Sequence, residues 1–124
     1  MREHNMGIFE GWQWETEPDP IKQQLWEELL KARAAGDVHW KAKNSESLAE
    51  FTTRVHSFTQ MLAQKHAGET IIIVTHGGTI NRLMEIYGLK KITEYISYNN
   101  TSLTILTKNG VDYQLGLHND ISHL

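Results

Sequence analysis

The amino-acid sequence predicts an α/β fold in which one parallel strand and a C-terminal β-hairpin are flanked by helices. Two segments, residues 20–35 and 47–67, repeat apolar residues at helical spacing. The β-branched run at residues 71–74 does not alternate with polar residues, which is typical of a parallel strand covered on both faces. Asn109-Gly110 separates two strand-like segments near the end of the chain, so we expect a hairpin there.

Length and composition restrict the class of protein. A chain of 124 residues with 40% hydrophobic content is enough for one compact domain, so we expect residues 1–124 to form a single domain. The net charge of -3 argues against nucleic acid as a partner. The chain contains no cysteine, which excludes disulfides, thiolate metal sites and a cysteine nucleophile. No apolar stretch reaches the ~20 residues of a membrane span, and no signal-peptide pattern is present, so we expect a cytoplasmic protein without membrane contact.

The first helix has clear signals at both ends. Residues 1–12 show neither helical nor strand periodicity, so we expect a loop or a short helical turn. Asp19 is a good N-cap, and Pro20 suits the first helical position. Gly36 suits the end of this helix.

The second helix has the strongest pattern in the chain. Ser47 and Glu50 have the spacing of a capping box. One face then carries apolar residues at three- and four-residue steps: Leu48, Phe51, Val55, Phe58 and Leu62. We expect the helix to end near residues 67–68, where glycine can adopt the left-handed conformation.

The remaining elements follow in the order strand, turn, helix and hairpin. The run at 71–74 is expected to be an interior parallel strand that ends in the turn His76-Gly77-Gly78. Thr79 can cap a helix over residues 80–87. The hairpin is expected to pair residues 102–107 with residues 113–117.

His76 is the strongest candidate for chemistry. It follows a predicted parallel strand and precedes a helix N-terminus, which is where α/β folds bind ligands. Free backbone N–H groups and the helix dipole favour an anion there, and a phosphate fits. Alternatively, His76 only fills a gap at the end of a strand. A His-Gly-Gly turn also occurs in esterases, but the chain lacks their G-x-S-x-G elbow, so an esterase ranks lower.

The other histidines and the tryptophans give weaker signals. No H-x-x-x-H or H-E-x-x-H spacing occurs among the remaining histidines, and no metal or organic cofactor is implied: His4, His39, His56, His66, His118 and His123. The four tryptophans either roof a substrate pocket or cover the core, and the sequence leaves both readings open: Trp12, Trp14, Trp26 and Trp40.

Five segments match motifs of one known family in the same order. They are residues 3–12 (E-x-x-x-G-x-x-E-G), residues 44–55 (similar to G-E-S-x-x-E-F-x-x-R-V), Val74-Thr75-His76-Gly77-Gly78, Asn100-Thr101-Ser102-Leu103, and Asn119-Asp120 with His123-Leu124. In this order, the chain resembles the C-terminal part of the histidine phosphatase superfamily, which is phosphoglycerate-mutase-like. The resemblance implies a partial three-layer sandwich, incomplete at its N-terminal side.

The resemblance also implies a mechanism and assigns residues to it. In this family a histidine is phosphorylated and then hydrolysed, and a carboxylic acid protonates the leaving oxygen. By motif position, His76 matches a second histidine that donates to the phosphoryl group, and Gly77 and Gly78 match substrate-binding backbone. Glu3 matches the proton donor, although an exposed N-terminal carboxylate is the simpler alternative. The chain lacks an obvious insertion for bisphosphoglycerate, which favours a phosphatase over a mutase.

Part of the family pattern is absent from these 124 residues. The family's nucleophilic histidine and one phosphate-binding arginine lie in an Arg-His-Gly motif, and no Arg-His-Gly occurs here. Arg2 is in the wrong place for the other pocket arginine, and Arg54 and Arg82 fall on predicted helices. We therefore expect a phosphomonoester hydrolase that is inactive alone, or else a non-catalytic phosphate-binding or regulatory module.

The same absence determines which partners we expect. The substrate implied is a phosphorylated small molecule. In the family the missing strand lies beside the run at 71–74, which would otherwise present an unpaired edge. We therefore expect a homo-oligomer or a complementing N-terminal segment to cover that edge. The whole assignment depends on His76 facing a pocket at the point where a strand passes into a helix.

Overall fold

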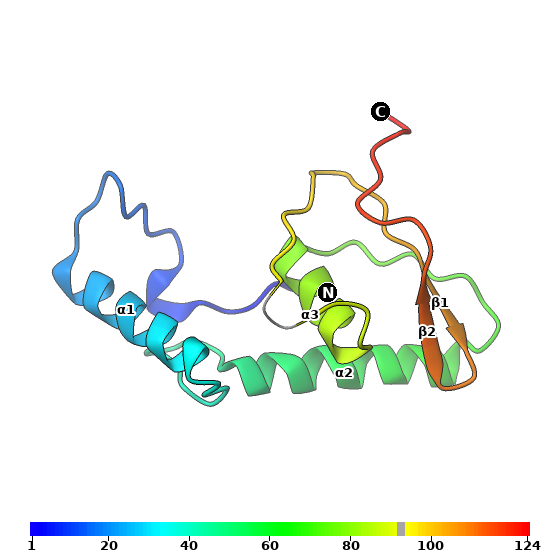
Figure 1. Ribbon diagram of the computed structural model, residues 1–124, viewed down its shortest axis with the longest axis horizontal. Coiled ribbons are helices and arrows are strands. Elements are labelled where there is room, and N and C mark those ends of the chain that lie inside the picture. The colour runs from blue at the N-terminus through cyan, green and yellow to red at the C-terminus, as the bar shows by residue number, and fades with distance from the viewer. Residues whose placement is uncertain (92–93) are drawn as a thin grey trace. The chain divides into compact units, whose positions relative to one another are not determined.

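The computed structural model describes residues 1–91 and 94–124, which divide into two compact units. One unit is His4–Ala67, and the other joins Met1–Glu3 to Gly68–Leu124. The described elements, in chain order, are η1 (Gly7–Phe9), α1 (Pro20–Ala34), α2 (Leu48–Lys65), α3 (Gly77–Ile86), β1 (Leu106–Asn109) and β2 (Asp112–Leu115) (Figure 1). Helices combined with a two-stranded sheet confirm the α/β class expected of a partial phosphoglycerate-mutase-like fold.

The first two helices begin where their capping residues predict. The Asp19 carboxylate accepts hydrogen bonds from two backbone N–H groups of the first turn of α1, at 3.0 and 3.1 Å. At the start of α2, Ser47 and Glu50 form the reciprocal capping box, with bonds of 3.2 and 2.8 Å. Within the described ranges, no helix combines the length and apolar character needed to cross a bilayer.

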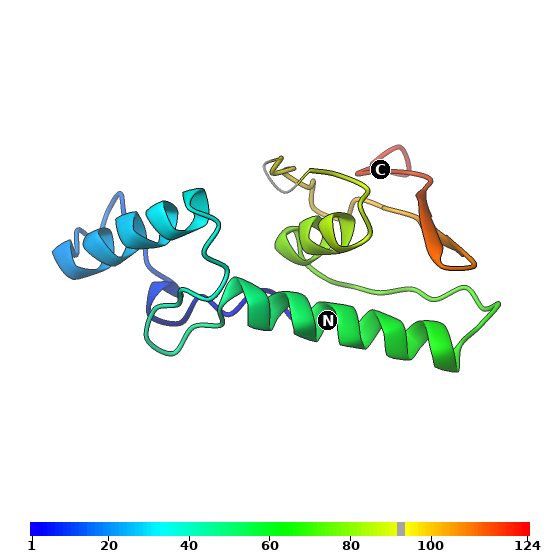
Figure 2. The same cartoon turned by 60° about the horizontal axis from the view of Figure 1, so that its bottom comes forward.

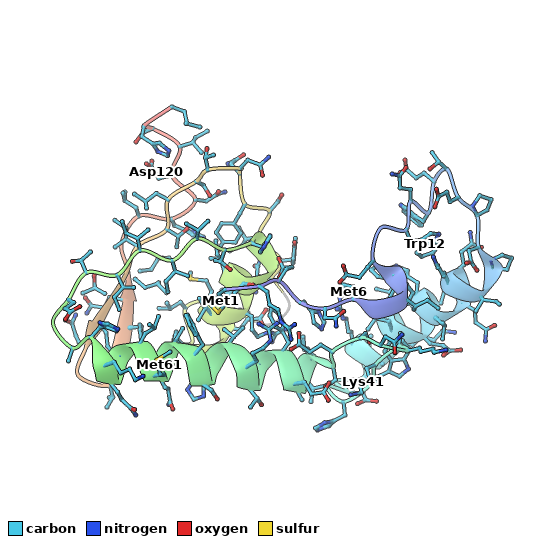
Figure 3. The ribbon with its side chains drawn as sticks, turned by 180° about the vertical axis from the view of Figure 1, so that it is seen from behind. Met1, Met6, Trp12, Lys41, Met61 and Asp120 are labelled. Carbon is cyan, nitrogen blue, oxygen red and sulfur yellow. The ribbon has the colours of Figure 1, made fainter. Side chains whose placement is uncertain are left out.

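The unit His4–Ala67 has its own hydrophobic core. Phe9, Leu29 and Ala42 are buried together, and Trp26 packs edge-on against Phe9 with ring centroids 5.3 Å apart. Trp12, which is labelled in Figure 3, packs against this core, and so does Trp40. Trp14, by contrast, is 62% exposed. Three of the four tryptophans therefore cover the core of this unit.

The predicted C-terminal hairpin is present, but its strands are Leu106–Asn109 and Asp112–Leu115 instead of residues 102–107 and 113–117, and its turn is displaced by one residue. β1 and β2 pair antiparallel, and Asn109 lies opposite Asp112, so the two-residue loop is Gly110-Val111 (Figures 1 and 2). Gly110 has a φ of 61°, which is the left-handed value that a glycine at the first loop position supplies. The arms extend past the strands, because Leu103 and Asp120 form an isolated bridge.

The prediction of a strand at residues 71–74 is wrong. Among the described residues, this run joins no ladder, and Figures 1 and 2 show it as irregular chain leading into α3. Ile72 is 89% exposed and Val74 is 86% exposed. β-Branched residues favour an extended backbone, but a strand forms only where a neighbour satisfies its N–H and C=O groups. The predicted three-layer arrangement is therefore not built around this run.

Candidate functional site

α3 begins earlier than the sequence predicted. Its first residue is Gly77 instead of Ile80, and its N-cap is His76, with φ -116° and ψ 159°. The His76 side chain makes no capping hydrogen bond, and Thr79 lies inside the helix instead of capping it. A helix that starts in His-Gly-Gly has no local side chain to accept its first N–H groups. An acceptor from elsewhere in the chain must fill that place.

The carboxylate of Glu3 is that acceptor. Its Oε2 accepts the backbone N–H of Gly78 at 3.0 Å, and its Oε1 accepts the hydroxyl of Thr79 at 3.2 Å. Directly before His76, the hydroxyl of Thr75 donates a hydrogen bond to the carbonyl of Met1 at 2.9 Å. Glu3 is 75 positions before Gly78 in the sequence, but its carboxyl group contacts the first turn of α3.

The two glycines of the turn have different surroundings. A Cβ on Gly78 would lie 2.6 Å from Oε1 of Glu3 and 2.9 Å from its Cδ. A Cβ on Gly77 would meet only the Tyr98 side chain, at the ordinary contact distance of 3.5 Å. Gly78 therefore leaves the space that the Glu3 carboxyl group occupies, whereas Gly77 lies against an aromatic ring.

The start of α3 carries a backbone N–H group that can donate a hydrogen bond to an anion. His76 is exposed, so its imidazole is not turned into an apolar interior. Among residues 1–91 and 94–124, no backbone acceptor pairs with the Gly77 N–H at the positive end of the α3 dipole. The described part of the chain contains no group of three or more His, Asp or Glu side chains arranged to hold a metal ion. His76, the Gly77 N–H and the residues that hold the Glu3 carboxyl group lie within four consecutive positions at the start of α3.

Asn81 joins a second segment to this turn, and no sequence pattern predicted this role. Its side-chain amide donates to the carbonyls of Gly77 and Ile96, at 3.0 and 2.7 Å, and accepts the Ile96 N–H at 3.0 Å. It is 4% exposed, so these hydrogen bonds satisfy a buried amide. The sequence signal for this role was a polar Asn among the apolar residues of a predicted helix.

Tyr98 and His118 complete the described surroundings of Gly77. The Tyr98 hydroxyl and the Nε2 atom of His118 are 2.9 Å apart, and the two rings meet edge-on. Burial raises the pKa of Tyr98 above its usual value of 10.0. No histidine spacing in the sequence indicated a role for His118. Only the fold of the C-terminal segment could bring it near the turn.

Arg54 on α2 and Arg82 on α3 are engaged in ion pairs. Arg54 binds Glu46 in a bidentate pair, with its Nε and Nη2 atoms 2.7 and 2.8 Å from the two carboxylate oxygens. The hydrogen bonds from Arg54 lower the pKa of Glu46 from 4.5, although burial opposes this shift. In the other unit, Arg82 pairs with Glu85 at 2.5 Å. The motif residues at the start of α2 therefore hold that helix start together.

The comparisons with known proteins identify the family. The model of the histidine phosphatase superfamily (branch 1) matches residues 1–121, so the chain belongs to this superfamily. Phosphoglycerate mutase-like protein 4 of Arabidopsis thaliana is 28% identical over 127 residues, covering 100% of this chain and 52% of that protein. The chain thus spans about half the length of the curated relative that it matches. No solved structure gives a significant match.

Proposed function

We propose that these residues are the second half of the catalytic site of a phosphomonoester hydrolase that works through a phosphohistidine. The observation that supports this most directly is the Glu3 carboxyl group, which lies at the start of α3 two residues from His76. Membership of the histidine phosphatase superfamily supplies the reaction class. The two described units would then belong to a single, incomplete histidine-phosphatase-like domain over residues 1–124.

Each residue of the turn has a distinct part in this proposal. His76 donates a hydrogen bond to the phosphoryl group of a phosphorylated small molecule, and the Gly77 N–H donates a second one. Gly78, whose N–H is already taken by Glu3, contributes the space that its missing side chain leaves. Glu3 is the general acid.

The proposed reaction has two steps, and its nucleophile comes from an Arg-His-Gly segment that these residues do not contain. A ring nitrogen of that histidine attacks phosphorus, the P–O ester bond breaks, and the leaving oxygen takes the proton of Glu3. Water then attacks phosphorus, the P–N bond breaks, and the Glu3 carboxylate takes a proton from the water. Inorganic phosphate leaves, and Glu3 is protonated again.

The chain alone is therefore proposed to be inactive, with a partner surface along residues 71–74. This apolar run has no ladder among the described residues, and Ile72 and Val74 are almost fully exposed. Its backbone groups suit a β-strand from a complementing N-terminal segment or from a second copy of the chain. Light scattering coupled to size-exclusion chromatography tests the second copy, since a stable monomer would exclude it.

The test of the proposed function compares the chain with and without an Arg-His-Gly segment. The purified chain should not hydrolyse p-nitrophenyl phosphate. If the DNA upstream encodes such a segment in frame, joining it should give turnover that His76→Ala and Glu3→Gln both reduce by at least about 100-fold. His39→Ala and Glu15→Gln are matched controls, because both side chains are exposed in the other unit.

A non-catalytic phosphate-binding module is the second candidate, because the Gly77 N–H at the start of α3 can bind an anion without any nucleophile. It predicts that inorganic phosphate shifts the Gly77 and Gly78 amide signals in ¹H–¹⁵N spectra of the chain, and that His76→Ala removes the effect. An upstream stop codon would support this module over the hydrolase. Turnover after the segment is joined would support the hydrolase over the module.

A further inference from the structure

Thr79 directs its side-chain hydroxyl to residues outside its own helix. In α2, Thr52 and Thr59 donate their hydroxyls to carbonyls four residues earlier, at 2.7 and 3.1 Å. Thr79 is 0% exposed, and its hydroxyl reaches outside its own helix to Oε1 of Glu3 at 3.2 Å and to the carbonyl of Arg2 at 3.3 Å. A fully buried hydroxyl aimed at a carboxyl group holds that group in one place.

We propose that Thr79 is the positioning residue for Glu3, and that with the Gly78 N–H it forms a clamp on both carboxyl oxygens. Gly78 holds Oε2 from the backbone and Thr79 holds Oε1 from a buried side chain. The inference extends the proposed function by naming the side chain that orients the general acid.

The hydroxyl of Thr79 keeps the clamp closed in both protonation states of Glu3. It has a single proton, and a charged carboxylate is a stronger acceptor than a neutral carbonyl, so the proton goes to an ionised Glu3. When Glu3 carries a proton on Oε1, that proton can be donated to Thr79, whose own proton then turns to the carbonyl of Arg2. No backbone has to move between the two states.

Two-dimensional NMR of the chain without any substrate tests the clamp. The Gly78 amide proton and the Thr79 methyl group should both shift with pH at one common midpoint, and Glu3→Gln should abolish both shifts. Thr79→Val, which keeps the shape and removes the hydroxyl, should change the midpoint that the Gly78 amide reports, and Thr79→Ser should restore it.

The clamp is wrong if the Thr79 methyl group does not follow the Gly78 amide in the wild-type chain, a result that needs no variant to fold. It is also wrong if Val and Ser at position 79 give the same midpoint, provided that both variants melt like the wild type. These signals are measured without phosphate or turnover. A negative activity test therefore contradicts the hydrolase proposal but not the clamp. A negative NMR result contradicts the clamp but not the activity result.

Discussion

Gly78 donates its backbone N–H to Oε2 of Glu3 at 3.0 Å, and the two residues are 75 positions apart in the sequence. The same carboxyl group lies where a Cβ on residue 78 would be, with Oε1 only 2.6 Å from that position. One glycine thus provides both a donor and the room for its acceptor. The start of α3 therefore depends on Glu3, which lies far from α3 in the sequence.

Gly78→Ala should displace the Glu3 carboxyl group while changing the free energy of unfolding only slightly. Alanine favours a helix over glycine by about 0.5–1 kcal/mol, while loss of a cap costs about 1 kcal/mol, so the unfolding free energy should change by less than about 1 kcal/mol. The added Cβ should nevertheless displace the carboxylate, and the amide of residue 78 should stop responding to Glu3. Chemical denaturation and pH-dependent NMR measure the two effects.

Gly77→Ala is the matched control for that substitution. Its Cβ would meet Tyr98 at ordinary contact distances of 3.5 and 3.6 Å and would not touch Glu3. The Gly78 amide should therefore keep its pH response in this variant. If both variants lost the pH response of the residue 78 amide equally, the turn would tolerate no side chain at either position. The explanation that Gly78 alone makes room for Glu3 would then be wrong.

Gly7 and Gly11 should respond very differently to alanine. Both have a positive φ, 56° and 70°, so both substitutions carry the left-handed cost of about 1–2 kcal/mol. A Cβ on Gly7 would also lie 2.5 Å from the carbonyl oxygen of Lys43 and 2.6 Å from the carbonyl carbon of Asn44, whereas nothing lies within 4 Å of a Cβ on Gly11. We expect Gly7→Ala to cost at least about 2 kcal/mol more in denaturant unfolding.

Local sequence predicted those elements whose ends are fixed by neighbouring residues. Asp19 and the pair Ser47 and Glu50 cap α1 and α2 with their own side chains, so the first residue of each helix follows from a few letters. The position of Gly110 likewise predicted the hairpin to within one residue. In each case the stabilising contact spans fewer than about five residues, which is the range of capping and turn signals.

The errors occurred where the stabilising contact is distant or outside the described residues. Thr79 has the composition of an N-cap, but Glu3 takes that place, so α3 starts at Gly77. The apolar run at 71–74 has strand propensity without a ladder, and propensity alone cannot supply one. The family assignment was tied to that strand, yet it holds through the match over residues 1–121. The motifs named Glu3 and His76, but not Thr79 or Asn81, which hold the turn together.

Acid should destabilise the fold partly through Glu46. The bidentate hydrogen bonds from Arg54 lower its pKa in the folded state below 4.5. A lowered folded-state pKa means that the stabilisation is complete above pH 4.5 and is lost as the pH falls through the lower folded-state value. Glu46→Gln should cost about 1–3 kcal/mol at pH 7 and should flatten the loss of stability below pH 4.5.

Glu15→Gln is the control for the acid prediction, because Glu15 is an exposed carboxylate of the same unit. It should change neither the unfolding free energy at pH 7 nor its decline in acid. Denaturant unfolding at a series of pH values measures both variants. A Glu46→Gln curve parallel to that of the wild type below pH 4.5 would mean that this ion pair does not contribute to acid unfolding.

Alkaline conditions should destabilise the unit that contains Tyr113. Its ring stacks on Tyr87 with centroids 3.7 Å apart, and burial, together with a hydrogen bond to Tyr87, raises the pKa of Tyr113 to about 12. A raised folded-state pKa means that this stabilisation is complete below pH 10 and is lost as the pH rises towards 12. Tyr87→Phe keeps the stacked ring and removes the hydroxyl, so it should lower the pKa of Tyr113, which NMR of the ring signals can follow. Tyr113→Phe should make unfolding less sensitive to pH between 10 and 12; an unchanged pH dependence would mean that the hydroxyl of Tyr113 is not protected by the fold.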